Sequence, residues 1–137
     1  MEIEVIDNSE EVRAALKAAA LRALERCGLF GEGAAKDKLT ENKSVDTGNL
    51  LNSISHKVVE GENAVYIGTN VYYAPYVELG TGKYASSGGR PDPWVYKDSN
   101  GNWHHTNGQR ARPYLKPAIA DNKDSYRGII KDELENA

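Results

Sequence analysis

The chain of 137 residues has only one cysteine, one methionine and one phenylalanine, and it has no long hydrophobic run. A single cysteine, Cys27, excludes an internal disulfide, and its place among apolar residues at helical spacing predicts a buried thiol. Because no apolar run approaches ~20 residues, we expect no membrane span. The chain begins with alternating Glu2-Ile3-Glu4-Val5, which is not the apolar core of a signal peptide. These absences predict a soluble intracellular protein in a reducing compartment.

Neither sign of charge dominates the sequence, which has a formal net charge of -3. The charges are unevenly distributed: residues 1–82 contain 8 basic and 13 acidic side chains, residues 83–116 contain 6 and 2, and residues 117–137 contain 3 and 5. A locally basic segment can meet phosphates or an acidic protein surface, and it is equally compatible with an ordinary solvated loop. The length predicts one domain, 1–137.

The triplet Asp46-Thr47-Gly48 has two incompatible interpretations. In an aspartic protease it follows an apolar strand, and two copies at a dimer axis share a proton between their aspartates. Here the preceding residues, 40–44, are polar, and the following residues, 49–54, have helical spacing. Asp or Thr just before such a run is an N-cap signature, so we favour Asp46 or Thr47 as a helix cap and keep the protease as a remote alternative.

A long amphipathic helix is predicted from about Ser9, where Asn8 and Glu11 form a capping-box pattern. Glycines between residues 28 and 33 each weaken a helix by roughly 1 kcal/mol relative to alanine. We therefore expect a bend or break there, and an end before Ser44. The apolar stripe recurs at steps of three and four: Val12, Leu16, Ala19, Ala20, Ala23, Cys27 and Phe30.

Three segments have strand patterns. The alternation at residues 2–5 predicts a short edge strand. Residues 53–59 and 64–69 are rich in β-branched and aromatic side chains and flank a polar turn, which predicts an antiparallel hairpin. His56 shares a face with apolar neighbours, and for it we favour a half-buried strand histidine over a ligand or a base.

Residues 71–82 combine tyrosines with a proline and two glycines. A short helix is predicted, with Pro75 in its first turn and Gly80 as its C-terminal cap. The segment Gly80-Thr81-Gly82 is not followed by Lys-Ser or Lys-Thr, so a phosphate-binding P-loop is not indicated.

Residues 83–111 form a long excursion rich in Gly, Ser, Asn and Pro. Within it, Asn100-Gly101 predicts a β-hairpin, with Trp103 opposite Tyr96 or Asp98 in an aromatic cluster. Two tryptophans on an excursion indicate a contact surface as much as a core. The adjacent His104-His105 pair points to opposite faces of a strand, so it does not indicate a metal site.

A last helix is predicted after residue 113, with Pro117 in its first turn. Its apolar stripe comprises Leu115, Ile119, Tyr126, Ile130 and Leu134.

Three stretches in a fixed order carry a resemblance. They are Val-Asp-Thr-Gly-Asn-Leu at residues 45–50 with Ser53-Ile54, Tyr-Ala-Pro-Tyr-Val-Glu-Leu-Gly-Thr at 73–81, and Arg-Pro-Tyr-Leu-Lys-Pro-Ala at 112–118. Together they resemble the tail-component, or head-tail joining, proteins of long-tailed double-stranded-DNA bacteriophages of the Hong Kong coliphage type. The likeness spans about residues 9–135. It departs at Leu51, where many members have arginine, and at the glycines near Gly31.

The resemblance implies an α+β fold, with a long N-terminal helix and a C-terminal helix packed on a small antiparallel sheet and with an inserted β-hairpin. It implies no catalytic activity and no cofactor. It also implies assembly, in the host cytoplasm, into or onto a ring at the head-tail junction or the upper end of the tail, with other neck and tail proteins as partners. A homo-oligomer is expected in the virion, while a monomer of the isolated protein and DNA passage through a ring lumen are left open. The residues implied as caps and turns are Asp46, Thr47, Gly48, Gly80, Thr81, Pro113 and Pro117.

Two classes of function follow for the excursion. In a structural assembly protein, the interface candidates are Tyr73, Tyr76, Trp94, Tyr96, Trp103, Arg110 and Arg112. In a nucleic-acid-binding module, the contacts would come from Lys83, Arg90, Lys97, Arg110, Arg112 and Lys116. In a ring the basic groups would line a DNA channel, so the two hypotheses overlap.

Overall fold

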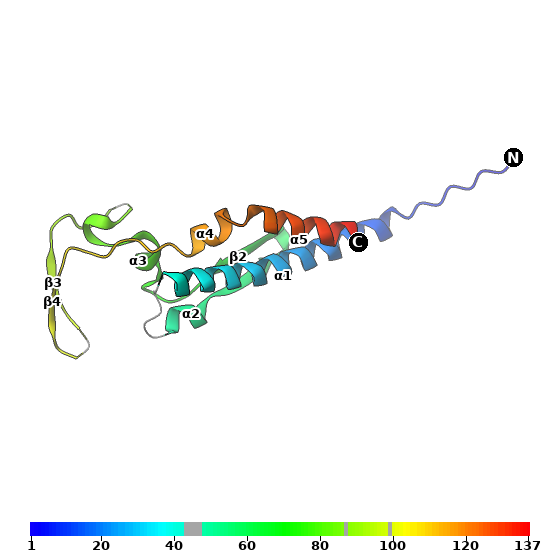
Figure 1. Cartoon of the computed structure of the whole chain (residues 1–137). Coiled ribbons are helices and arrows are strands. Elements are labelled where there is room, and N and C mark those ends of the chain that lie inside the picture. The colour runs from blue at the N-terminus through cyan, green and yellow to red at the C-terminus, as the bar shows by residue number, and fades with distance from the viewer. Residues whose placement is uncertain (43–47, 87, 99) are drawn as a thin grey trace.

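The molecule is elongated around one long helix (Figure 1). The computed structural model describes residues 1–42, 48–86, 88–98 and 100–137. Helix α1 (Ser9–Glu41) is the central rod, and a hairpin of β3 (Trp94–Lys97) and β4 (Trp103–Thr106) projects from one end of the molecule. The other elements are α2 (Asn49–Ser53), β1 (Ser55–Val59), β2 (Ala64–Gly68), α3 (Ala74–Leu79), α4 (Leu115–Ala120), α5 (Lys123–Glu135) and two 3-10 turns, Glu60–Glu62 and Gly82–Tyr84. The α+β class is confirmed.

Helix α1 begins at Ser9 as predicted, but the capping box is wrong. The Asn8 side chain makes no cap hydrogen bond, and the Ser9 N–H donates to the Asp7 carboxylate at 2.9 Å instead. The predicted bend is also wrong, since the helix is continuous through Gly28 and Gly31. A methyl group at Gly28 would collide with the His56 ring, and one at Gly31 would collide with the Ile67 side chain. These glycines therefore let the sheet approach the helix closely.

The strand predicted at residues 2–5 does not form. Residues 1–8 are exposed and belong to no helix or strand, and they extend from the end of α1 away from both sheets (Figure 1). An alternating pattern becomes a strand only where a partner supplies the ladder of hydrogen bonds.

The predicted hairpin of β1 and β2 is confirmed as an antiparallel pair, with His56 opposite Ile67 and Val58 opposite Val65. The contacts of Gly28 and Gly31 show that His56 and Ile67 lie on the face packed against α1. The alternate positions face solvent, where Tyr66 is exposed.

His56 is a half-buried strand residue, as favoured, and it is also a polar link between the sheet and α1. Its Nδ1 lies 2.5 Å from Glu32 Oε1, and its Nε2 lies 2.6 Å from Glu25 Oε1. Only a protonated imidazole can donate to both carboxylates. Burial lowers the pKa of His56, but the bonds to Glu32 and Glu25 outweigh it and hold the pKa above the ordinary 6.5.

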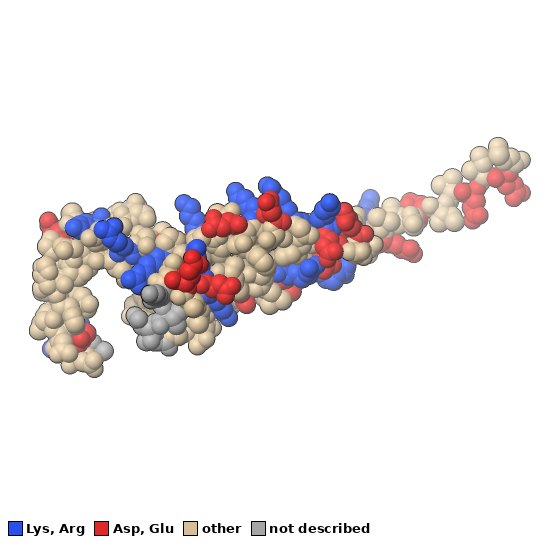
Figure 2. All heavy atoms as spheres, viewed as in Figure 1, with Lys and Arg blue, Asp and Glu red and all other residues tan. Residues whose placement is uncertain are grey.

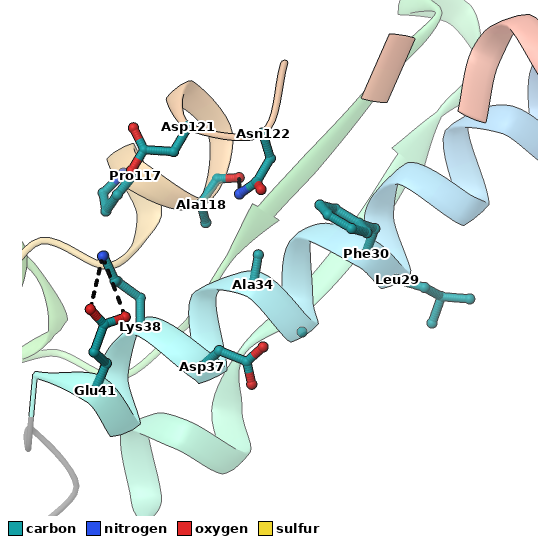
Figure 3. Close-up of a pocket in the computed structure, with 11 residues that line it drawn as sticks. Leu29, Phe30, Ala34, Asp37, Lys38, Glu41, Pro117, Ala118, Asp121 and Asn122 are labelled. Carbon is teal, nitrogen blue, oxygen red and sulfur yellow. Dashed lines mark hydrogen bonds and ion pairs between the residues drawn. The ribbon is translucent and has the colours of Figure 1, made fainter. Parts of the chain in front are cut away.

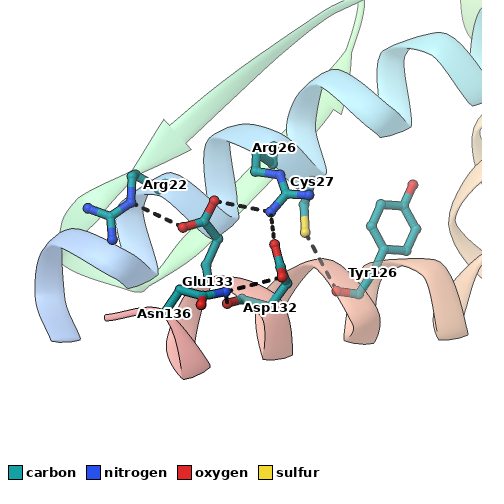
Figure 4. Close-up of polar contacts among 7 residues, drawn as sticks. All are labelled: Arg22, Arg26, Cys27, Tyr126, Asp132, Glu133 and Asn136. Carbon is teal, nitrogen blue, oxygen red and sulfur yellow. Dashed lines mark hydrogen bonds and ion pairs between the residues drawn. The ribbon is translucent and has the colours of Figure 1, made fainter.

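The predicted single C-terminal helix is two helices, α4 and α5. The break lies at Asp121-Asn122, where the Asn122 side-chain amide donates to the Ala118 carbonyl at 2.9 Å and competes with the helical ladder. Helix α5 then runs antiparallel along α1. The contacts between these two helices pair Arg22 with Glu133, Arg26 with Asp132 and Glu133, and Cys27 Sγ with the Tyr126 carbonyl (Figure 4).

Cys27 is buried, as predicted, and burial raises the pKa of its thiol, so it stays protonated. The apolar core is small and lies where the C-terminal half of α1 meets α2, α3 and α4. Its buried members are Ala35, Leu39, Leu50, Ile54, Ala74, Tyr114 and Ala118. Within the described ranges, no helix has the length and apolar character needed to cross a membrane.

Gly48 immediately precedes α2 with a left-handed φ of 75°, a conformation that glycine adopts without steric cost. The helix itself is in the predicted position. Asp46 and Thr47, the predicted cap residues, lie outside the described residues.

Candidate protein interface

Hydrogen bonds join the two ends of the excursion beside α3. Gly80 ends α3 as predicted, with φ 79°, and a side chain there would press against the backbone at Ala111 and Tyr84. The Thr81 N–H donates to the Gln109 carbonyl at 2.8 Å, and the Gln109 N–H donates to the Thr81 hydroxyl at 2.7 Å. Gly80 and Thr81 therefore fix where the excursion leaves and rejoins the body.

Glu78 caps helix α4 from a distance in the sequence. Its carboxylate accepts the backbone N–H groups of Tyr114 at 2.7 Å, Leu115 at 3.0 Å and Lys116 at 2.9 Å. These are the unpaired donors at a helix start, and an anion there also interacts favourably with the helix dipole. The chain returns from the hairpin to α4 through residues 107–114, the return segment. Its Arg112 N–H donates to the Val77 carbonyl at 2.7 Å, so α3 binds this segment as well as the start of α4.

Tyr114 lies in the core beneath this cap and is fully buried. Among the described residues its hydroxyl has no hydrogen-bond partner. Burial raises its pKa to about 12, so the phenol is neutral. Pro113, just before it, stays at the surface, where its carbonyl accepts the Asn42 side-chain amide at 3.0 Å.

Along the excursion, basic side chains lie over aromatic rings. The Arg110 guanidinium lies 4.6 Å and the Lys83 ammonium 5.1 Å from the centre of the Tyr84 ring. Arg90 lies 5.5 Å from the Trp94 ring. Figure 2 shows Lys and Arg gathered over the segment that links the hairpin to the body. Such cation–π pairs hold the cations over flat apolar surfaces, a combination common at the centre of protein interfaces.

The predicted hairpin of the excursion is confirmed, but its predicted register is wrong. Trp103 lies opposite Lys97, and Tyr96 lies opposite His104. The expected cluster of aromatic rings across the strands is therefore a stacked Tyr96–His104 pair, with 5.2 Å between ring centres, and a Lys97 ammonium 6.0 Å from the Trp103 ring.

The hairpin tip is stiffened by Asp98. Its carboxylate accepts the backbone N–H groups of Asn100 and Asn102 at 2.9 Å each, and it lies 2.7 Å from His104 Nε2. The bond to His104 lowers the pKa of Asp98, with backbone donors adding to the effect. The hairpin thus keeps a defined shape although it projects from the body (Figure 1).

The structure brings some of the predicted interface residues together and separates others. Tyr76 and Trp94 line one hollow of about 480 Å³ beside α3. Tyr96 and Trp103 lie on the hairpin, with Trp103 69% exposed, whereas Tyr73 packs against the core. Arg110 and Arg112 lie on the return segment, both exposed, and Pro117 is in the first turn of α4 as predicted.

The sequence alone did not predict the contacts by which Glu78, Tyr84 and Asp98 hold this region together. Glu78 is separated from its partners by 36 to 38 residues, so no local sequence pattern predicts that it caps α4. Asp98 gave a usable signal, because an Asp two residues before Asn100 in a tight turn commonly accepts the backbone N–H. Over the described part of the chain, no group of three or more His, Cys, Asp or Glu side chains is placed to hold a metal ion.

Comparison with known proteins identifies a family. Residues 3–80 match the family described as "Bacteriophage HK97-gp10, putative tail-component". This range covers more than half of the chain, and the chain belongs to this family of bacteriophage tail components. The matched range contains α1, both strands of the first sheet and α3, whereas the projecting hairpin, α4 and α5 lie outside it. No curated protein and no solved structure matches the chain.

Proposed function

We propose that this protein is a structural component of the phage neck or upper tail that joins or completes head-tail attachment as a ring of identical copies, without enzymatic activity. The observation that carries the proposal is the β3–β4 hairpin, which is stiffened at its tip, projects from the body and exposes Trp103 (Figure 1). A stiff exposed aromatic surface is the kind of feature that anchors a partner. Membership of a tail-component family supports a place in the virion.

Truncation of the exposed indole tests the proposal. We expect the parent protein to form a ring-sized oligomer in native mass spectrometry over a concentration series, and we expect Trp103→Ala to remain a folded monomer. Tyr66→Ala is the matched control, because Tyr66 is 57% exposed on the body rather than on the hairpin. Unfolding of the Trp103→Ala variant, measured by circular dichroism, would count against an assembly role.

A second candidate function is DNA contact through the basic excursion. It is favoured by the exposure of the basic side chains of this segment: Lys83, Arg90, Lys97, Arg110, Arg112 and Lys116. Phosphate contacts by such groups would give duplex binding that weakens steeply with salt. Absence of binding at low salt would remove this function and leave the structural one unaffected.

The remote protease hypothesis depends on Asp46. An obligate dimer in the same mass spectra, together with proteolysis at acidic pH that is lost in Asp46→Asn, would revive it. We expect neither result.

A further inference from the structure

The hairpin has two unlike faces. Because Lys97 lies opposite Trp103 and Val95 lies opposite His105, these four side chains share one face, which we call the open face. The opposite face also reaches solvent, with Tyr96 47% exposed, but its rings are paired, since Tyr96 stacks on His104 and Arg90 lies over Trp94. On the open face Val95 is 59% exposed and Trp103 is 69% exposed, with the Lys97 ammonium beside the indole. The open face thus combines apolar surface with a cation and is uncovered.

A groove of about 500 Å³ between α1 and α4 has the complementary character (Figure 3). Its apolar walls are Leu29, Phe30, Ala34, Pro117 and Ala118, and Asp37, Lys38, Glu41 and Asp121 supply the charges.

The charge of this groove is negative. Lys38 lies 3.4 Å from the Glu41 carboxylate, so the ammonium is already compensated. Within the described ranges, the side chains of Asp37 and Asp121 have no ion-pair partner. Two unpaired carboxylates beside apolar walls suit a partner that brings an apolar side chain and a cation together.

We infer that the groove between α1 and α4 of one copy receives the open face of the hairpin of a second copy, with Trp103 against the apolar walls and Lys97 beside Asp37 and Asp121. This inference rests on the proposed function, because it names the contact between copies in the ring. The hairpin projects away from its own α4 (Figure 1), so the groove it fills belongs to another copy.

A second hollow, next to the α1–α4 groove, does not suit the open face of the hairpin. Besides Lys38, which is paired with Glu41, it is lined by two cations, Arg112 and Lys116, and one carboxylate, Asp121. This excess of positive charge would repel Lys97. Charge therefore selects the α1–α4 groove over this hollow.

The inferred contact is heterologous, since the hairpin and the groove are different surfaces of the chain. Each added copy leaves one hairpin and one groove unfilled until the assembly closes. Repeated head to tail, such a contact closes into a ring where the rotation between successive copies allows it, and otherwise continues as an open filament. The ring is the outcome that the proposed function requires.

Charge reversal tests the inference in the full-length protein. In Lys97→Glu the side chains at positions 97 and 121 are both negative, and in Asp121→Lys they are both positive, so this pair repels at every contact. We expect either variant alone to self-associate at least roughly tenfold more weakly than the parent, measured by sedimentation over a concentration series. Lys57→Glu and Asp124→Lys are the matched controls, because they make the same charge changes on exposed parts of β1 and α5 and should leave self-association unchanged.

Mixing the two variants gives the decisive readout. In a mixture, the side chain at position 97 of each variant meets one of opposite charge at position 121 of the other variant, so assembly should return. The double variant Lys97→Glu/Asp121→Lys restores the same complementarity and should also assemble by itself. Rings that survive either single reversal, or that fail to return on mixing, would overturn the inference and leave the proposed function standing. A parent protein that stays monomeric at every concentration would also overturn the inference. The chain would then act in joining by binding a different protein rather than a second copy of itself.

Discussion

At the scale of single residues, His56 joins the sheet to α1 through two carboxylates. Its pKa in the folded protein is raised above 6.5, so its contribution to stability is complete below about that pH and is lost as the pH rises through the folded pKa. We expect the melting temperature of the parent to fall as the pH rises through the pKa that His56 has in the folded protein. In His56→Gln, which keeps a hydrogen-bonding side chain without the charge, this part of the pH dependence should disappear.

Thermal melts at closely spaced pH values measure the effect. His105→Gln is the control, because His105 is exposed on the hairpin and contacts no carboxylate of α1. Identical pH profiles for the parent and His56→Gln would show that the link to Glu25 and Glu32 contributes nothing.

Two glycines of α1 give opposite predictions for the same substitution. Alanine at Gly28 would collide with the His56 ring, whereas none of the described residues lies within 4 Å of a methyl group at Gly33. Overpacking costs about 1–3 kcal/mol, and alanine recovers up to about 1 kcal/mol of helix propensity. We therefore expect Gly28→Ala to lower the free energy of unfolding and Gly33→Ala to raise it, as measured by urea denaturation. A stabilised Gly28→Ala would mean that the sheet is not held against the helix at this position.

At the scale of elements, α4 depends on a cap supplied by α3. Glu78 accepts three backbone N–H groups, and its removal leaves these donors at the start of α4 without an acceptor. A lost cap costs about 0.5–2 kcal/mol, and bonds to a charged acceptor lie toward the upper end. We expect Glu78→Ala to destabilise the protein by about 2 kcal/mol in urea denaturation. Glu2→Ala, which removes a carboxylate from the exposed N-terminal segment, should have no measurable effect.

Amide hydrogen exchange would locate the effect of Glu78→Ala. Faster exchange confined to Tyr114, Leu115 and Lys116 and the turn that follows would agree with a lost cap. Unchanged exchange at these three amides would contradict the role given to Glu78.

At the scale of the whole molecule, we propose that the body folds as one domain independently of the projecting hairpin. Gly89 and Asn107 both lie against Gly82, so the two ends of the hairpin segment come close together. Replacing residues 90–106 by a short Gly-Ser linker should therefore leave a single unfolding transition near the parental melting temperature, while self-association is lost. Calorimetry and sedimentation measure the two effects separately. A large fall in melting temperature would show that the hairpin is part of the core.

Much of the fold was predictable because helix starts, turns and alternation are local signals. The start of α1 at Ser9, the two hairpins, and α3 with Pro75 inside it and Gly80 after it are all confirmed. Each depends on residues within a few positions of one another, where propensity and turn geometry decide the outcome.

The errors share a different physical cause. Gly31 was predicted to break the helix, but contact with Ile67, 36 positions away, requires glycine there. The residues 2–5 alternate as a strand would, yet no strand in the described part of the chain pairs with them. Trp103 was predicted opposite Tyr96 or Asp98 and lies opposite Lys97, because the Asn100-Gly101 pair marks a turn without fixing the loop length that sets the register.

The sequence by itself determined most of the helices and strands, their order and the family motifs, because these follow from short-range backbone and side-chain preferences. Only the tertiary structure decided that Glu78 caps α4, that His56 lies between two carboxylates of α1, and that Tyr96 pairs with His104 on the hairpin face opposite Trp103. Those features depend on groups far apart in the chain, which become neighbours only when burial of the small core brings α1, the sheet and α4 together.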